Sequence, residues 1–396
     1  MVTHLSGPAW LPDHQLHVAF TLAHADALAE AMCDVLYQYL QPPGPLTLSS
    51  VFEQDLCHVT VADIAPLPPA VSRYAADVLT QLRAAVEHAL YAEVQFALGR
   101  DLTPDEAPRI EMPATTTAKA FTEWLNAKKR RQLPPLRDGS ELVRRMRALQ
   151  PYRRRDTDEH PMRVLAHHTN LAKHRTPAVA AVRLGRVHTW PLGDPDIVVG
   201  AENAPLDVGT VLATGPKYRQ VPLSIWPQVA IQRPHTGEWK VIAKEVGMLA
   251  TWVRTVAIPI LVTGEAEAEP PLPPQVDLSK GTKDPREVIR AGGAVPAHQR
   301  HLIRMQAHTG RDDLIDTLLL HPAKPDAATM RRWVSGLSDE MVVTRLEELG
   351  NAAKRGPLQT ADACLSMIRL AEKAGSPSRA RDGGGCQGGY GSLPGD

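Results

Sequence analysis

The hydrophobic pattern of this 396-residue chain changes its period near residue 178. Before that point apolar residues recur at three- and four-residue steps, which is typical of helices; the longest such stretches are residues 16–40 and 70–98. After it come short β-branched runs separated by Gly, Pro and Asp, which are typical of strands. A helical period returns over residues 284–374. The sequence therefore predicts an α+β fold.

Breaks in composition divide the chain into six expected parts. Clusters of proline, glycine and acidic residues mark their boundaries, because such clusters interrupt helices and strands. The expected parts are a flexible N-terminus at 1–15, a mostly helical domain at 16–176 with a β-hairpin at 46–64, a β-rich region at 177–264, an acidic, proline-rich linker at 265–283, a helical C-terminal region at 284–374 and a disordered tail at 375–396. The last strand of the β-rich region is expected at residues 252–262.

Charge is unevenly distributed although the formal net charge is +0. Residues 128–186 contain 16 Lys+Arg against 5 Asp+Glu, and the rest of the chain contains 28 against 39. Such asymmetry indicates a basic face able to meet a polyanion such as RNA. The alternative is a solvated surface, or a contact with the acidic remainder of the same protein.

Cysteine usage and hydropathy exclude several classes. The spacing of Cys33, Cys57, Cys364 and Cys386 fits neither a metal site nor a disulfide framework, so we expect no metal and no cofactor. The N-terminus lacks the pattern of a signal peptide. No apolar run approaches the roughly 18 residues that span a bilayer. We therefore expect a cytoplasmic protein without a membrane partner.

A first set of candidate catalytic residues lies in the helix expected at 70–98. Arg83 and Glu87 are four residues apart and share a face, whereas His88 lies about 140° further round. Arginine can hold a phosphate, and histidine can act as general acid or base near neutral pH. One helix cannot aim both groups at one atom, so a shared site needs another helix or a second subunit. The alternative is a surface ion pair beside a partly buried histidine.

A second set lies in the helix that Pro161 can open. Arg163, His167, Asn170 and His174 recur at steps of four, three and four residues, which places them on one stripe. The two histidines lie roughly 10 Å apart, too far to bind one metal ion without other ligands. Polar packing is the alternative. The candidate nucleic-acid-binding residues at the end of this helix are Asn170, Lys173, His174 and Arg175.

The order of short motifs resembles a widespread group of uncharacterised bacterial proteins. The motifs are IAPLP at 64–68, LRAAVEH at 82–88, IEMP at 110–113, LQPY at 149–152 and NLAKHR at 170–175, and the resemblance covers roughly residues 59–184. The helix with Arg83 and His88 is similar to that of the HEPN superfamily, whose motif is arginine, four to six residues, then histidine. Ala84 departs from the Asn, Asp or His that often follows the arginine there, although Glu87 could supply the polar group.

The resemblance implies an all-helical domain that acts as a metal-independent endoribonuclease in phage defence or a toxin system, or as a non-catalytic RNA- or nucleotide-binding module. It also implies a homodimer, in which two such helices are paired, and a partner of the antitoxin kind. A third hypothesis is an interaction protein that uses its β-rich and C-terminal parts. Arg83 and His88 supply little apolar burial, so we expect replacing them to leave the fold intact.

Overall fold

The computed structural model describes residues 8–128, 130, 132–189, 195–219, 223–279 and 281–375. The chain forms two compact units, Met1–His301 and Leu302–Asp396. Helices and two small antiparallel sheets make up the fold, which confirms the α+β prediction. The first seven residues of the expected N-terminus and nearly all of the expected tail lie outside the described residues.

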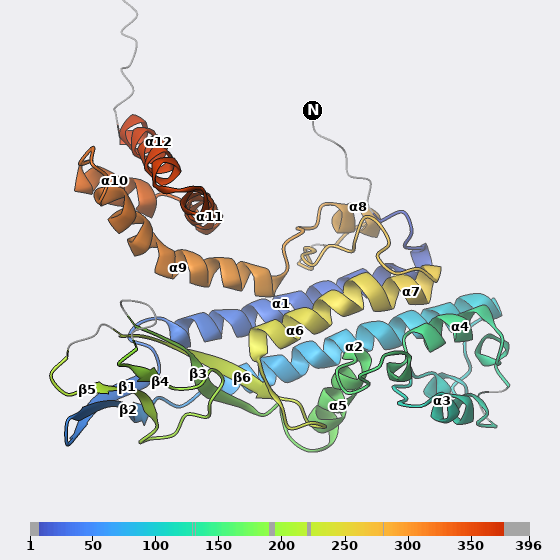
Figure 1. The fold of residues 1–396 in the computed structure, drawn as a ribbon. Helices are drawn as coiled ribbons and strands as arrows, with labels where there is room; N and C mark the ends of the chain where they lie inside the picture. Colours follow the sequence, from blue (N-terminus) through green and yellow to red (C-terminus); the bar gives the residue numbers. More distant parts are fainter. Residues whose placement is uncertain are drawn as a thin grey trace, which may run out of the picture. The chain divides into compact units, whose positions relative to one another are not determined.

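Two long helices form the centre of the first unit. α1 spans Leu16–Leu40 and α2 spans Pro69–Leu98, close to the predicted bounds, and they pack along each other (Figure 1). Their facing side chains are fully buried; they include Leu22, Met32, Leu36, Leu79, Leu82 and Leu90. α2 ends at Gly99, whose φ of 66° places it in the left-handed region that favours glycine.

Shorter helical elements follow α2 and cover its flank. They are the 3-10 turn Ala107–Arg109, α3 Ala118–Leu125, the 3-10 turn Pro134–Leu136, α4 Glu141–Ala148, the 3-10 turn Pro151–Arg153 and α5 Pro161–His174. Each of the three helices begins at a residue whose side chain accepts a backbone N–H, namely Thr117, Ser140 and His160. A further 3-10 turn, Asp13–Gln15, precedes α1.

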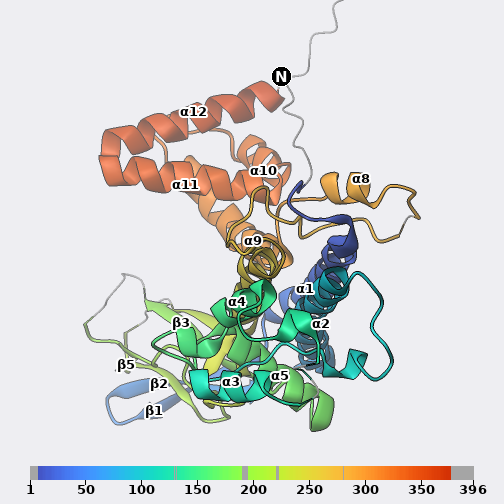
Figure 2. The ribbon, with the colours of Figure 1, turned by 90° about the vertical axis from the view of Figure 1, so that its right-hand side faces the viewer.

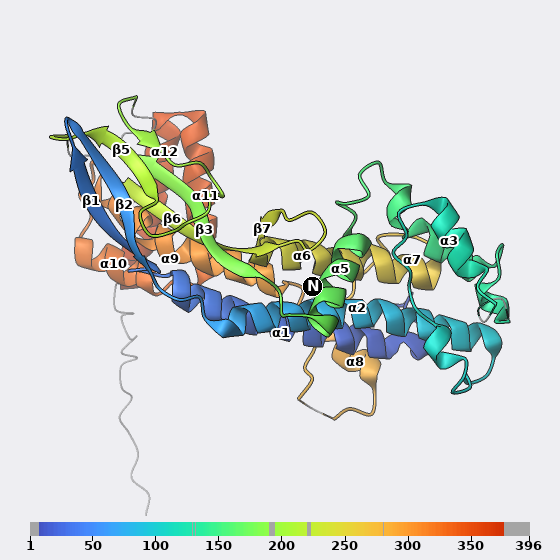
Figure 3. The ribbon, with the colours of Figure 1, turned by 90° about the horizontal axis from the view of Figure 1, so that it is seen from below.

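The strands form two antiparallel sheets (Figure 3). The first has the order β1-β2-β5-β4, and the second has the order β3-β6-β7. Their bounds are β1 Leu46–Glu53, β2 Leu56–Ile64, β3 Ala180–Thr189, β4 Val198–Val199, β5 Val211–Pro216, β6 Leu223–Gln232 and β7 Trp239–Val241. The predicted hairpin β1–β2 is present, and β2 also pairs with β5 in the register Val59↔Ala213. A small apolar cluster that includes Val61, Leu184 and Leu212 lies between the two sheets.

The predicted strand at 252–262 is wrong, because this segment is helical. α6 spans Ile242–Trp252, a π-helical turn spans Val253–Ala257, and α7 spans Ile258–Thr263. Nearly every residue from 252 to 262 is apolar or β-branched, so no helical period is visible in the sequence. The helices nevertheless form because they are buried against α1, α2 and α4.

The same segment corrects the expectation that no stretch is long enough to cross a membrane. Ile242–Thr263 is a helical stretch of 22 residues with a mean hydropathy of 1.6 in its most apolar window. Of that window, 56% is buried inside the protein. A largely buried core helix meets the same criteria of length and composition, so this helix is weak evidence for a membrane span.

Residues 265–283, the expected linker, lie within the first unit. Leu272 is buried in its core, and Trp10 donates a hydrogen bond from Nε1 to the carbonyl oxygen of Pro270 at 2.9 Å. The helix α8, Pro285–Arg290, follows, and Gln275 pairs with Gly293 in an isolated bridge. The division between the units falls inside α9, Ala297–Leu319, rather than in this segment.

The second unit is helical. It contains the C-terminal part of α9, then α10 Ala327–Ser335, α11 Asp339–Arg355 and α12 Pro357–Gly375 (Figure 2). α12 packs against α10 and α11. Their shared core includes Leu314, Met330, Val334, Met367 and Ile368, all almost fully buried.

A buried ion pair joins β6 to α6 in the first unit. Arg233 follows the last residue of β6, and its Nε and Nη2 donate to the two carboxylate oxygens of Glu245 at 2.6 and 3.0 Å. Both side chains are less than 5% exposed. Arg233 also donates to Glu159 at 2.6 Å. Burial would lower the pKa of Arg233, but its bonds to Glu245 and Glu159 raise it.

Two buried histidines lie in α5 and at its start. His160 is 3% exposed and accepts a hydrogen bond at Nδ1 from the backbone N–H of Met162. His168 is 2% exposed, and neither of its ring nitrogens has a hydrogen-bond partner. Burial, aided by the charge of Arg154, lowers the pKa of His160 to about 4. Burial, aided by His235 and Arg233, lowers the pKa of His168 to about 4. Both rings are therefore neutral at neutral pH.

Candidate functional site

Arg83 and Glu87 form a clamp on the backbone of Met112. The two side chains are paired, as their four-residue spacing predicted. Arg83 donates from Nη2 to the carbonyl oxygen of Met112 and from Nη1 to Sδ of Met162 at 3.0 Å. Glu87 accepts from the backbone N–H of Met112 at 2.7 Å. Burial raises the pKa of Glu87 although Arg83 opposes it. These contacts fix the segment before α3 against α2.

Replacing Arg83 by alanine is therefore expected to destabilise the first unit. Loss of a charged donor leaves the Met112 carbonyl without its partner and the Glu87 carboxylate without its cation, although Glu87 still accepts the backbone N–H of Met112; such a loss costs about 2–3 kcal/mol. Urea unfolding followed by circular dichroism measures this loss. Arg73→Ala, at an exposed position of the same helix, is the matched control and should stay within about 0.5 kcal/mol of the parent. Equal unfolding of the two variants would contradict the clamp.

His88 points away from the clamp and lies on an open groove. The groove has a volume of about 820 Å³ and lies at one end of the α1–α2 pair, where the start of α1 meets the C-terminal part of α2. His14 comes from the 3-10 turn before α1, His17 from the first turn of α1 and His88 from α2. The rings of His17 and His88 are tilted toward each other with 6.0 Å between their centroids. Burial, and next the charge of His88, lower the pKa of His17.

The carboxylate of Glu93 orients the imidazole of His14, which also lines the groove. Glu93 is 11% exposed, and its Oε1 lies 2.9 Å from Nε2 of His14 and accepts a hydrogen bond from Gln15 at 2.9 Å. Gln15, fully buried, also donates to the carbonyl oxygen of Ala89. A carboxylate bound to one ring nitrogen fixes the orientation of an imidazole and leaves its other nitrogen to act on a ligand.

Aromatic and cationic side chains line the rim of the groove. Phe96 is 68% exposed, and its ring stacks on His14 with 4.2 Å between centroids. Tyr91 and Gln95 lie on the same face of α2. Arg100 follows Gly99, and its guanidinium donates to both carboxylate oxygens of Glu106 at 2.8 and 2.9 Å. An exposed ring beside a cation is the arrangement on which unpaired bases stack.

The candidate nucleic-acid-binding residues at the end of α5 do not line this groove. Asn170, Lys173, His174 and Arg175 are exposed at the C-terminal end of α5. The N-terminal turn of α5 contacts Arg83 through Met162. Lys173 therefore lies about 16 Å further along the helix axis from that contact. Their role in nucleic-acid binding stays a prediction.

Several arginines of the basic region at 128–186 pair with acids. Arg130, Arg145, Arg147 and Arg163 pair with Glu111, Glu141, Asp138 and Asp158, and Arg145 also lies 3.6 Å from Glu93. Arg144 and Arg186 pair with Glu141 and Glu202. The three arginines at 153–155 are exposed, as are Lys173 and Arg175 at the end of α5. Among these pairs only Glu93, Glu111 and Glu202 are acids from outside residues 128–186, so the pairs compensate a minor part of the local basic excess.

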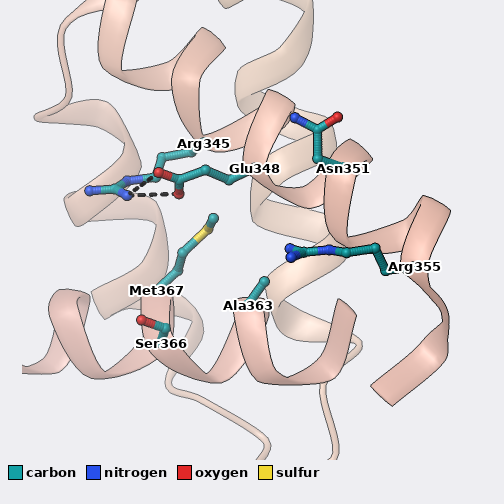
Figure 4. A pocket seen from close by; sticks show the side chains of 7 residues that line it. All are labelled: Arg345, Glu348, Asn351, Arg355, Ala363, Ser366 and Met367. Carbon is teal, nitrogen blue, oxygen red and sulfur yellow. Dashed lines mark hydrogen bonds and ion pairs between the residues drawn. The ribbon is translucent and has the colours of Figure 1, made fainter. Parts of the chain in front are cut away.

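The second unit carries a hollow of about 720 Å³ between α11 and α12 (Figure 4). Arg345 and Glu348 lie at one side, and Arg355 extends from the other side toward Met367. Arg345 donates to both carboxylate oxygens of Glu348 at 3.0 and 2.8 Å, so its charge is already compensated. This hollow is a weaker candidate than the histidine-lined groove.

No known family model, curated protein or solved structure matches this chain. Among the residues that the structure describes, no three His, Cys, Asp or Glu side chains are grouped so that they could hold a metal ion. The HEPN resemblance therefore stays a prediction, as does the catalytic assignment of Arg83, Glu87 and His88. The sequence reasoning missed His14 and His17, whose only signal is a histidine every three residues beside the start of α1.

Proposed function

We propose that the groove lined by His14, His17 and His88 binds single-stranded RNA and cleaves it without a metal ion. The observation that supports this most is the pair of neighbouring imidazoles, His17 and His88, which both line an open groove with 6.0 Å between their centroids. The groove also offers Phe96 as a stacking surface. We place this activity in the cytoplasm, where a homodimer or an antitoxin-like protein could control it.

Two neighbouring imidazoles divide into an acid and a base. A positive charge on one ring opposes a charge on the other, so a proton on either ring favours the neutral form of its neighbour. Burial favours the neutral form of His17. In the proposed reaction His17 takes the proton of the ribose 2′-hydroxyl, whose oxygen attacks the adjacent phosphorus. His88 gives a proton to the departing 5′-oxygen, and a cyclic phosphate remains.

The test is incubation of the full chain with a single-stranded RNA oligonucleotide, with and without chelator. We expect equal cleavage in both, and products ending in a cyclic phosphate. The same sequence as DNA should stay intact because it lacks the 2′-hydroxyl. Cleavage that stops with chelator, or that cuts DNA equally, would refute the proposed reaction.

A non-catalytic RNA-binding module is the second candidate. Its support is that Arg100, which lines the groove, is held by Glu106, and that Arg83, the predicted phosphate-binding cation, is held in the clamp. A nuclease needs a donor for the charge that develops on the scissile phosphate. If the oligonucleotide binds with a steep salt dependence and is never cut, this second function replaces the first.

A further inference from the structure

The first unit has a cavity away from the groove, bounded by the π-helical turn of Val253–Ala257. Its volume is about 420 Å³, within the range of small-molecule sites. The proline-rich segment 270–274 forms one wall, and the loop after α8 forms another with Ile289 and Gly292. Leu272 and Ile289 are almost fully buried, so much of the lining is apolar.

Arg254 is a charged side chain in this lining. It is 5% exposed, and neither Nε nor Nη2 has a hydrogen-bond partner. Within the described part of the chain, no carboxylate lies at ion-pair distance from it. A buried guanidinium with two unpartnered nitrogens and no ion pair is strongly unfavourable, and burial accordingly lowers the pKa of Arg254.

The nearby acids do not neutralise Arg254. Asp26 accepts the backbone N–H of Ala297 at 2.9 Å with one oxygen, and its other oxygen accepts from Arg300 at 3.2 Å. Glu269 lines the cavity only at its exposed rim, where Arg290 is also exposed. The donors of Arg254 are thus left for a group from outside the chain.

We propose that this cavity binds a small carboxylic acid with an apolar body, whose carboxylate is taken by Arg254. The planar guanidinium fork matches the two oxygens of a carboxylate. The proline and isoleucine walls suit an alkyl or aryl chain and exclude the hydration shell of a bare inorganic anion. The site is independent of the RNA chemistry proposed for the histidine-lined groove. π-Helical turns are frequent at functional sites, and Arg254 lies in one.

Calorimetric titration of the full chain with n-octanoate tests this site. n-Octanol carries the same chain without the charge, and inorganic phosphate carries charge without the chain. We expect octanoate to bind at concentrations up to about 1 mM, and octanol and phosphate to bind at least tenfold more weakly. Arg254→Met should weaken octanoate binding about 10- to 150-fold, the range for a hydrogen bond to a charged group. Arg290→Met, at the exposed rim, is the matched control and should change it less than threefold, as screened surface charges do.

The melting temperature without ligand gives a second, independent readout. Because Arg254 is buried and unpaired, Arg254→Met should raise it, which also shows that the variant folds. Failure to bind octanoate, equal binding of octanol or phosphate, or unchanged binding by Arg254→Met would each overturn the proposal. A lower melting temperature would assign Arg254 to the fold instead. His88→Ala should leave octanoate binding unchanged.

Discussion

Replacing His88 by alanine is expected to reduce RNA cleavage by about 10²- to 10⁴-fold, the usual contribution of a general acid or base. His17→Ala should cause a loss of the same order, since the two rings supply the two halves of one proton transfer. His88 is exposed, so its removal should not affect folding. The measurement is kcat/KM on a single-stranded RNA oligonucleotide at neutral pH in the presence of chelator.

His24→Ala is the matched control, because His24 is an exposed histidine of α1 and does not line the groove. It should cleave at the parent rate. The pH profile adds a second criterion. The pKa of His17 lies below its ordinary value of 6.5, so the rate should fall on the acid side only below that pH. A loss of less than about tenfold in His88→Ala would exclude His88 as a proton carrier.

The first unit is expected to lose about 6 kcal/mol of stability between pH 6.5 and pH 4. In this window His160 and His168 are neutral in the folded chain, where each has a pKa of about 4, but take up protons once unfolded. The unfolded chain binds more protons, so stability falls as the pH falls through this range. Each shift corresponds to about 3 kcal/mol. Urea unfolding at a series of pH values measures the slope, with tryptophan fluorescence as a probe, because Trp252 packs edge-on against His160 with 5.7 Å between the ring centroids.

His168→Leu and His160→Asn separate the two contributions. His168 has no hydrogen-bond partner to lose, so leucine should remove about half of the acid-induced loss at little cost near neutral pH. Asparagine at 160 can still accept the N–H of Met162 and removes the other half. Stability that is flat from pH 6.5 to pH 4, or unaltered slopes in both variants, would show that these histidines do not titrate in this way.

Local signals predicted much of the helical structure. α1, α2 and α5 begin and end within about one residue of the expected bounds, because Gly99 and Pro161 act on the backbone directly. The hairpin β1–β2 also follows from local alternation. α6 and α7 could not be predicted in this way, since a buried apolar segment has no polar face to reveal its period.

The candidate site depends on contacts that no local pattern contains. His17 and His88 are seventy-one residues apart and meet only because α1 packs along α2. The sequence correctly indicated that Arg83 and His88 diverge around one helix. It gave no sign that Arg83 would bind the backbone of Met112, so Arg83 was expected to be dispensable for folding. The groove could be predicted from the sequence only if the packing of α1 against α2 were known first.

The pairing of β2 with β5 also bears on how the chain is synthesised. His58 and Thr214 bond across these strands although 156 residues separate them. At about 5–20 residues per second, β5 leaves the ribosome roughly 8 to 30 seconds after β2. During that interval the edge of β2 that β5 later covers has no partner strand. An unpaired strand edge can pair with a strand of another chain. If no chaperone covers it, we expect the β2 edge to be the place where two nascent chains on one mRNA associate.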